Sequence, residues 1–356
     1  MLLINDIQLT IRSIADRFDS NQIVAVVAQS VAPQWQEMNF PFPMLTLEDG
    51  ETNKSLATVE RIWDFLLTHA ITRRGLLIAV GGGSVTDMAG FAAATYKRGI
   101  RYMNVPTTLL AMVDASTGGK TGFNYGGIKN AIGAFHTPVW TPIWPKWLES
   151  LPADELLSGY AEMLKTGLIG SASLWNRLLQ YDLETFDTEP LKPLITDCVA
   201  IKEQIVAADP QETELRKVLN FGHTFGHALE EMSLTGKAGL TAQRSNSAAV
   251  QQQSGLLHGF AVLYGLIAEL YLSVTLLGCP RKPLQQLTQL MLRYYGRPEC
   301  KCSDRQQLIE LMRQDKKNEH AGEINCTLLK DVGSPVCNRS VSSFQASEAL
   351  DYLFSL

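Results

Sequence analysis

The sequence predicts an α/β domain followed by a mostly helical domain. Strand-like apolar runs alternate with helix-like segments up to about residue 145, and helical spacing of apolar residues dominates after Trp144. A chain of 356 residues is long enough to form two domains. We therefore expect a parallel sheet with helices on both faces over residues 1–145, and a mostly α-helical domain over residues 146–356.

The elements of the first domain follow from short apolar runs and from helical spacing. Buried strands are expected at residues 23–27, 43–47, 76–80 and 102–105. The fourth strand is stopped by Pro106. One helix is expected where apolar residues recur every three or four positions between Leu56 and Leu66, and another over residues 87–96.

The second domain is expected to contain helices near 153–168, 173–183, 190–208, 220–232, 256–277, 283–295 and 304–316. The segment 256–277 is apolar enough to raise the question of a membrane span. It contains His258 and Glu269, so a buried core helix is the better interpretation. Residues 235–254 are rich in Gly, Ala, Ser and Gln, which is typical of a mobile surface loop.

The composition is that of a soluble globular protein. The chain is 46% hydrophobic and 19% charged, and its net charge of −5 gives no sign of nucleic-acid or membrane binding. Basic contacts with any anionic ligand must therefore be local. The six cysteines contain no CxxC pair, and no signal peptide is recognisable, so reduced thiols and a cytoplasmic location are expected.

A glycine-rich turn follows the third predicted strand. Gly81-Gly82-Gly83-Ser84-Val85-Thr86-Asp87 leads into a helix, where backbone N–H groups can approach a phosphate. The strict dinucleotide fingerprint needs glycine at position 86, where this chain has Thr86. A tight strand-to-helix turn without a ligand is the alternative.

A second polar cluster lies in a predicted loop region after the fourth strand. Hydroxyls, glycines and lysines gather between Pro106 and Asn130, a composition that suits a phosphate-rich ligand.

Two histidines, His223 and His227, lie four residues apart in a helical segment and so share one face. They can both bind a metal, or one can bind it while the other transfers protons. Two ordinary hydrogen-bonded histidines are the alternative. Glu162 and Lys165 also share a helix face, and on their own they indicate no more than an ion pair.

Taken together, these segments resemble the 3-dehydroquinate synthases, within the sugar-phosphate cyclases. The resemblance runs from about Asp49 to about Gly333. It is carried, in the family's order, by residues 81–87, 91–99, 106–110, 118–122, 161–165 and 220–230. It implies an N-terminal Rossmann-like NAD-binding domain and a helical metal- and substrate-binding domain.

The resemblance implies one catalytic divalent metal, Zn²⁺ or Co²⁺, bound by Glu162, His223 and His258. Three such ligands leave open positions for substrate oxygens. His227 is then assigned a proton-transfer role instead of metal binding.

The resemblance also implies contacts for NAD and for a small anionic sugar phosphate. Those to NAD are Asp49, Glu51, Lys54, Gly83, Ser84, Val85, Thr86, Asp87, Thr107, Thr108, Asp114, Lys120 and Lys129. In addition to His227, the resemblance assigns catalytic roles to Arg98, Lys120, Asn130 and Lys165. Substrate binding falls to Lys202, Arg216, Asn220 and one of Lys316 or Lys317.

The implied activity converts 3-deoxy-D-arabino-heptulosonate 7-phosphate to 3-dehydroquinate and phosphate. It proceeds by transient oxidation with NAD, phosphate elimination, re-reduction and intramolecular aldol closure. The implied setting is a cytoplasmic homodimer in the shikimate pathway of aromatic amino-acid biosynthesis.

Two features depart from the family pattern. Phe260 stands where many members have a glutamate that could support the metal site. The segment 235–254 lengthens the separation of His227 and His258, although closing a longer loop costs little additional free energy.

Three other functions compete with this interpretation. A metal-dependent alcohol or glycerol dehydrogenase also combines NAD with a metal, but a neutral substrate would not need Arg98, Lys165, Lys202 and Arg216. A cyclase making a valiolone or an inosose would act on a substrate without the carboxylate that Arg216 and Asn220 suit. A non-catalytic NAD-binding protein would not need the metal and proton-transfer residues.

Overall fold

The computed structural model describes the whole chain except residues 235–241, 244–254, 299–303, 315–317 and 319–321. The chain divides into two compact units, Met1–Pro152 and Ala153–Leu356. The boundary expected after residue 145 falls at the start of a short 3₁₀ helix, Pro145–Ser150, which belongs to the first unit.

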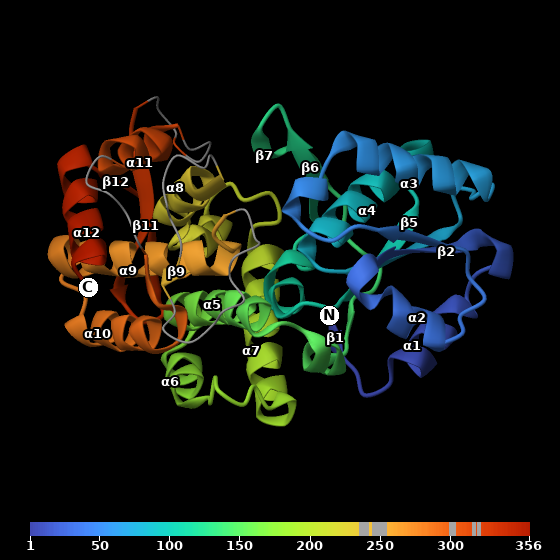
Figure 1. Cartoon of the computed structure of the whole chain (residues 1–356), viewed down its shortest axis with the longest axis horizontal. Helices are drawn as coiled ribbons and strands as arrows, with labels where there is room; N and C mark the ends of the chain where they lie inside the picture. The colour runs from blue at the N-terminus through green and yellow to red at the C-terminus, as the bar shows by residue number, and fades with distance from the viewer. Residues whose placement is uncertain (235–241, 244–254, 299–303, 315–317, 319–321) are drawn as a thin grey trace. The chain divides into compact units, whose positions relative to one another are not determined.

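The first unit is built on a four-stranded parallel sheet of order β3-β2-β4-β5. Its strands are β2 (Ile23–Ala28), β3 (Met44–Leu47), β4 (Leu76–Gly81) and β5 (Arg101–Pro106). Every residue of β2 and β4 is buried, because helices cover both faces of the sheet. Figure 1 shows α3 (Leu56–Thr68) and α4 (Gly83–Thr95) on one face, and α1 (Ile7–Ala15) and α2 (Ala32–Glu37) on the other.

The strand order places a topological switch beside the glycine-rich turn. From β2 the chain moves outward to β3 and then returns to β4 on the other side of β2. Ligands of open α/β sheets bind at the carboxyl ends of strands beside such a switch. The turn Gly81–Gly83 lies at the carboxyl end of β4, and Thr107 at the end of β5 donates its N–H to the Gly81 carbonyl at 3.0 Å.

The prediction of a loop after the fourth strand is wrong from Lys120 onward. Residues there form an antiparallel hairpin of β6 (Lys120–Tyr125) and β7 (Ile128–Phe135). Its turn is Gly126-Gly127, both at positive φ, which glycine adopts without steric cost. Most of β7 is exposed, so its sequence lacks the alternation of buried and exposed residues that identifies a strand. A further short pair joins β1 (Leu2–Leu3) to β8 (Pro142–Ile143).

The second unit is mostly helical, as expected. Its helices are α5 (Ala153–Gly170), α6 (Ala172–Gln180), α7 (Thr188–Ala208), α8 (His223–Leu234), α9 (His258–Leu277), α10 (Arg281–Leu290), α11 (Asp304–Arg313) and α12 (Ser343–Ser355). An antiparallel hairpin that the sequence did not predict, β11 (Ile324–Asp331) with β12 (Ser334–Val341), precedes α12. Two residues within the predicted surface loop form β9 (Ala242–Gln243), which pairs with β10 (Arg297–Pro298). The rest of that loop lies outside the described residues.

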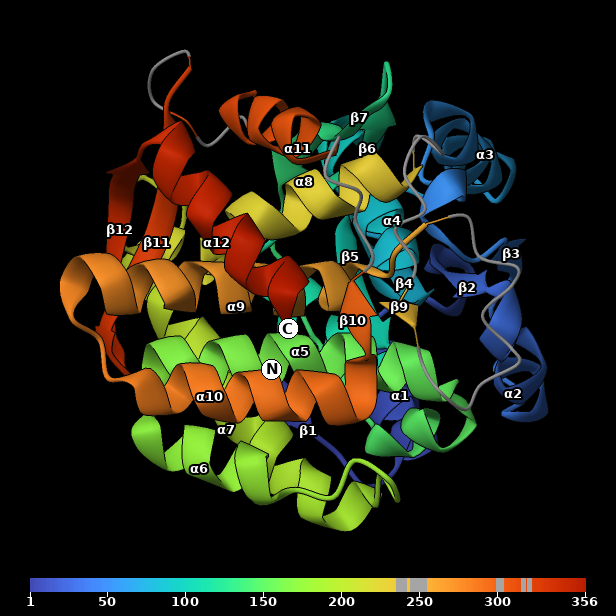
Figure 2. The same ribbon diagram turned by 60° about the vertical axis from the view of Figure 1, so that its left-hand side comes forward.

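Helix α9 forms the core of the second unit. It runs between α8 on one side and α5 and α10 on the other (Figure 2). By length and composition alone α9 could cross a membrane, yet most of its residues are buried inside this unit. The structure therefore agrees with the predicted core helix.

Candidate functional site

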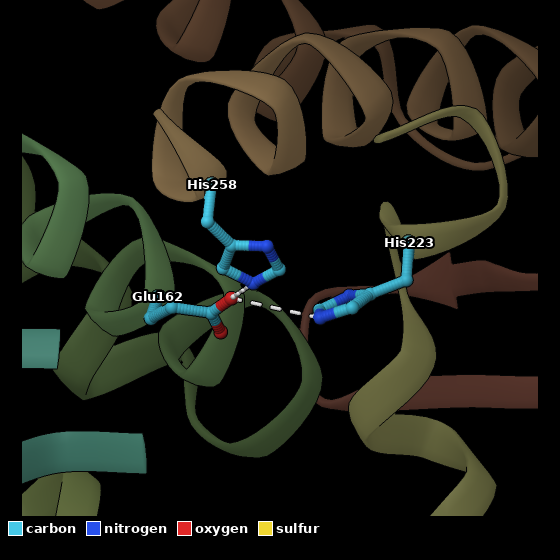
Figure 3. Close-up of side chains that lie close together, drawn as sticks. All are labelled: Glu162, His223 and His258. Carbon is cyan, nitrogen blue, oxygen red and sulfur yellow. Dashed lines mark ion pairs between the residues drawn. The ribbon is translucent and has the colours of Figure 1, made fainter. Parts of the chain in front are cut away.

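Three side chains of the second unit meet at one point: Glu162, His223 and His258 (Figure 3). One ligand atom from each lies within 4.8 Å of the other two. The Glu162 Oε1 atom is 3.3 Å from His258 Nε2 and 3.6 Å from His223 Nε2. Glu162 is fully buried and His223 is nearly so, which limits competition from bulk water.

The three residues come from three helices whose backbones approach closely. Glu162 lies in the middle of α5, whereas His223 and His258 are the first residues of α8 and α9. Beside His258, the Gly259 N–H donates to Ser158 Oγ at 3.0 Å. A Cβ atom at Gly259 would lie 1.9 Å from the Ser158 carbonyl oxygen, so only glycine permits this crossing of α9 over α5.

The outer nitrogen of each histidine faces an acceptor. His223 Nδ1 lies 3.2 Å from the Phe221 carbonyl oxygen, and His258 Nδ1 lies 3.4 Å from Glu230 Oε2. Such contacts fix the tautomer and the ring orientation of metal-binding histidines. In both residues, Nε2 is the nitrogen that faces Glu162.

The surroundings of His258 favour positive charge. Burial alone would lower the pKa of His258, but the charge of Glu230 and hydrogen bonds to Glu162 and Glu230 raise it to about 10. Two imidazole nitrogens and a carboxylate oxygen are also the ligand types of catalytic zinc sites. The donor set and its charge therefore fit a divalent cation.

His227 lies next to this group but outside it. Its ring centroid is 5.2 Å from that of His223 and 6.2 Å from that of His258. The described residues that bring ligand atoms together are Glu162, His223 and His258, without His227. Of the two interpretations of the histidine pair, the geometry favours one ligand and one neighbouring side chain that can exchange protons.

Among the described residues of the same unit, three cations are buried. Lys165 on α5, Lys202 on α7 and Arg216 in the short helix Leu215–Asn220 are 1%, 6% and 2% exposed. Lys165 forms an ion pair with Glu162. Such a concentration of cations makes this part of an acidic protein locally positive, which suits an anionic ligand.

One carboxylate holds the backbone of the loop that precedes Arg216. Asp209 accepts hydrogen bonds from the N–H groups of Thr213, Glu214 and Arg216. Burial would raise the pKa of Asp209, but these hydrogen bonds hold it well below its ordinary value. The same loop contains Glu212 at a φ of 60°, and Asn220 Nδ2 donates to Glu212 Oε1 at 2.9 Å.

In the first unit, the glycine-rich turn is the start of a helix. Helix α4 begins at Gly83, earlier than the expected residue 87, with Gly82 as its N-cap. The N-cap has no side chain to accept from the first N–H groups of α4. An N-terminus of this kind can bind a phosphate.

Two predicted cofactor residues, Lys54 and Asp87, contact each other beside this turn. Lys54, which is 4% exposed, pairs with Asp87 at 2.6 Å and donates a hydrogen bond to Asn130. Asp49 accepts hydrogen bonds from the Ser30 N–H and hydroxyl, both at 2.8 Å.

The remaining predicted residues are distributed over both units. Glu51 accepts a hydrogen bond from Asn124 at 2.9 Å. Arg98, Lys120 and Asn130 are exposed on the first unit, whereas Lys165, Lys202, Arg216 and Asn220 belong to the second. Lys316 and Lys317 lie outside the described residues.

Sequence reasoning missed the carboxylates that surround the metal-ligand group. Glu230 lies within the histidine segment, but its contact with His258 depends on how α8 and α9 pack. Glu269 stood out in the sequence as a charge in the apolar helix α9. Its hydrogen bonds to the backbone at the start of α8 are seen only in the structure. Phe260, in contrast, is packed in the core, where its ring centroid lies 4.9 Å from that of Tyr295.

Comparison with protein families gives two matches that together cover most of the chain. Residues 44–158 match the family described as 3-dehydroquinate synthase N-terminal, and residues 159–242 and 245–318 match 3-dehydroquinate synthase C-terminal. The 3-dehydroquinate synthase of Parabacteroides distasonis is 44% identical over 310 residues, which cover 87% of this chain and 83% of the relative. That of Halorhodospira halophila is 37% identical over 330 residues, which cover 91% and 88%.

Solved structures with the same fold include two sugar-phosphate cyclases. The 2-epi-5-epi-valiolone synthase of Streptomyces hygroscopicus, with NAD⁺ and Zn²⁺ bound, has a TM-score of 0.82 at 24% identity, with 99% of this chain and 95% of that chain covered. A 2-deoxy-scyllo-inosose synthase bound to carbaglucose-6-phosphate, NAD⁺ and Co²⁺ has a TM-score of 0.78 at 22% identity, with 99% and 96% covered. A probable glycerol dehydrogenase of Sinorhizobium meliloti reaches 0.59 at 12%, with 100% and 96% covered.

Proposed function

We propose that this chain, which belongs to the 3-dehydroquinate synthase family, converts 3-deoxy-D-arabino-heptulosonate 7-phosphate to 3-dehydroquinate and phosphate. In this proposal it is a carbon–oxygen lyase of the shikimate pathway, and it uses NAD and Zn²⁺ or Co²⁺. The observation that carries the proposal is the meeting of Glu162, His223 and His258 in a unit that also buries Lys165, Lys202 and Arg216.

The metal would be held by Glu162 Oε1 and by the Nε2 atoms of His223 and His258, the atoms that face one another. When bound, the metal supplies Lewis acidity and NAD supplies reversible hydride transfer. We assign to His227, whose ring is next to that of His223, the transfer of a proton to and from a substrate hydroxyl.

The buried cations would bind the charged ends of the substrate. Arg216 suits a carboxylate or phosphate because its guanidinium donates two parallel hydrogen bonds, and Lys165 and Lys202 act as point charges. Asn220 adds a neutral amide, held by Glu212. We assign the remaining substrate contacts to Arg98, Lys120, Asn130 and one of Lys316 or Lys317.

NAD would lie along the first unit at the carboxyl ends of β4 and β5. The start of α4 offers N–H groups to a pyrophosphate, and Thr107 and Thr108 offer hydroxyls nearby. Lys54 would hold Asp87 and Asn130 in place beside the cofactor. We assign to the same ligand Asp49, Glu51, Asp114, Lys120 and Lys129.

A dehydrogenase of a neutral alcohol is the main competing function, because glycerol dehydrogenases share the fold. Such an enzyme would have no use for the three buried cations. A cyclase for a substrate without a carboxylate remains a second candidate, since two such cyclases share the fold. Arg216 and Asn220 favour the carboxylated substrate.

We further propose that the protein works in the cytoplasm as a homodimer and binds neither nucleic acid nor membrane. The net charge of −5 and the burial of α9 support the expectation that it binds neither nucleic acid nor membrane. Sedimentation velocity would test the dimer, which requires twice the 39.3 kDa of the chain.

The function is tested by incubating the purified protein with the heptulosonate phosphate, NAD⁺ and Zn²⁺. We expect phosphate release, a carbocyclic product and no accumulation of NADH. Stoichiometric NADH would favour a dehydrogenase, and turnover of a heptulose phosphate without the carboxylate would favour another cyclase. Absence of phosphate release in the presence of excess metal would contradict the proposal.

A further inference from the structure

A carboxylate from α9 holds the start of α8. Glu269 Oε2 accepts from the Gly222 N–H at 2.8 Å, and Glu269 Oε1 accepts from the Thr224 N–H at 3.2 Å. These two N–H groups flank His223, the first residue of α8. Glu269 is fully buried, and the positive end of the α8 dipole favours its negative charge. The backbone on both sides of His223 is thus fixed by one side chain.

A carboxylate from α8 holds the start of α9 in return. Glu230 Oε2 lies 3.4 Å from Nδ1 of His258, the first residue of α9, and Glu230 is itself 5% exposed. Glu230 follows His223 by about two helical turns, and Glu269 follows His258 by about three, so each carboxylate shares a helix face with a histidine of its own helix. Each helix therefore carries one histidine of the metal-ligand group and one carboxylate that holds the other helix's histidine.

The backbones of α8 and α9 are in contact, so the two helices hold the carboxylate contacts between them rigidly. A Cβ atom at Gly265 of α9 would lie 1.9 Å from the Gly222 carbonyl oxygen, and one at Gly226 of α8 would lie 3.1 Å from the Ala261 carbonyl oxygen. The start of α8 thus lies against the middle of α9, while Glu230 reaches back to the beginning of α9. Neither helix can slide without breaking a carboxylate contact.

We propose that Glu230 and Glu269 are positioning residues that form a reciprocal clamp, presetting His223 and His258 for a divalent cation. Neither carboxylate is needed for the chemistry assigned above. This inference rests on the proposed metal site. The clamp would keep the metal ligands in the same geometry when no metal is bound. Its effect should appear in metal affinity before it appears in the chemical step.

The test uses the isosteric variant Glu269→Gln in the full chain. A glutamine amide can accept from only one of the two N–H groups, and its NH₂ opposes the other. Zinc affinity, measured by competition with a chromogenic chelator, should fall about 10- to 100-fold, as is usual when a partner of a metal ligand is lost. Excess Zn²⁺ should then restore kcat towards the wild-type value. The visible spectrum of the Co²⁺ form should report altered ligand geometry.

Ser273→Ala is the matched control for general weakening of α9. The Ser273 hydroxyl is buried, donates to the Glu269 carbonyl and accepts from the Leu329 N–H, so its hydrogen bonds are to α9 itself and to β11. Equal loss of zinc affinity in Ser273→Ala and Glu269→Gln would overturn the clamp and leave a structural role only. The exposed Glu231→Gln serves as the control for charge on α8.

The contact of Glu230 with His258 is tested independently by Glu230→Ala. This variant still decides the proposal if Glu269→Gln does not fold. Zinc affinity should fall in Glu230→Ala and stay unchanged in Glu231→Gln. Unchanged affinity in Glu230→Ala would overturn the clamp while the metal site stands. A wild-type protein that binds no divalent cation would overturn both the clamp and the proposed function.

Discussion

The candidate nucleotide turn of the first unit and the metal-ligand group of the second are built in opposite ways. The turn, Gly81–Asp87, is continuous in sequence, and its N–H groups belong to the start of one helix. The metal-ligand group takes side chains from three helices, between Glu162 and His258. A continuous backbone motif needs little beyond its own residues, whereas a dispersed group of side chains depends on how the helices cross.

The two regions also differ in how they hold charge. The second unit buries Glu162, Lys165 and Glu269 almost completely, so each needs fixed partners. In the first unit Lys120 and Asn130 are exposed, and of the lysines assigned to NAD only Lys54 is buried. We therefore expect changes in the second unit to act on metal binding and stability, and changes in the first to act on NAD affinity.

The largest effect is expected from Gly265→Ala. The new Cβ atom would lie 1.9 Å from a backbone oxygen of Gly222, so α8 must move away from α9. The free energy of unfolding should fall by about 3 kcal/mol, the upper part of the usual cost of overpacking, and the protein should lose divalent metal. Chemical denaturation and metal analysis measure both.

Gly278→Ala is the control for Gly265→Ala. It puts an alanine in the left-handed conformation at the end of α9, where no heavy atom lies within 4 Å of the new Cβ atom. The free energy of unfolding should fall by about 1 kcal/mol, and the metal should be retained. If Gly265→Ala kept wild-type zinc affinity, close approach of the two helices would not be what sets the site.

Lys54→Met tests the first unit. The lysine bonds to Asp87 and Asn130, and loss of charged hydrogen bonds worth about 1.5–3 kcal/mol should raise KM for NAD roughly 10- to 100-fold. Zinc content should not change, and the exposed Lys146→Met should behave like the wild type. Loss of zinc in Lys54→Met would break the division of roles between the units.

The smallest effect, and a pH-dependent one, is expected from Asp209→Asn. The hydrogen bonds to Asp209 lower its pKa in the folded protein below its ordinary value of 3.8, so its ionised form stabilises the fold. That stabilisation is complete above about pH 4–5 and is lost as the pH falls towards the lowered pKa. Urea denaturation should show Asp209→Asn less stable than the wild type by a constant amount from pH 8 to pH 5. A difference that grows on acidification would have the wrong sign.

Much of the fold was predictable because its elements carry local patterns. The four parallel strands are short, mostly apolar runs, fully buried in β2 and β4, and they occur within one residue of the expected ends. The hairpin β6–β7 was missed because its second strand is mostly exposed, and the helices α1 and α2 were not predicted either. The strand order at the switch is set by packing over the whole sheet, which no local pattern contains.

The site was predictable only in part, for the same reason. The spacing of His223 and His227 left open which of them binds a metal, and the choice rested on a family resemblance. The structure brings His258 beside Glu162 despite the long intervening segment. The partners Glu230 and Glu269 depend on contacts between α8 and α9, so spacing along the chain could not assign them.

We propose that the histidine pair divides its roles, with His223 on the metal and His227 beside it. Metal analysis of His223→Ala and His227→Ala, purified in parallel, tests this most directly. His223→Ala should lose the metal, whereas His227→Ala should keep one equivalent while its kcat falls about 10²- to 10⁴-fold. Loss of the metal from His227→Ala, or its retention in His223→Ala, would show that the two histidines do not divide the roles in this way.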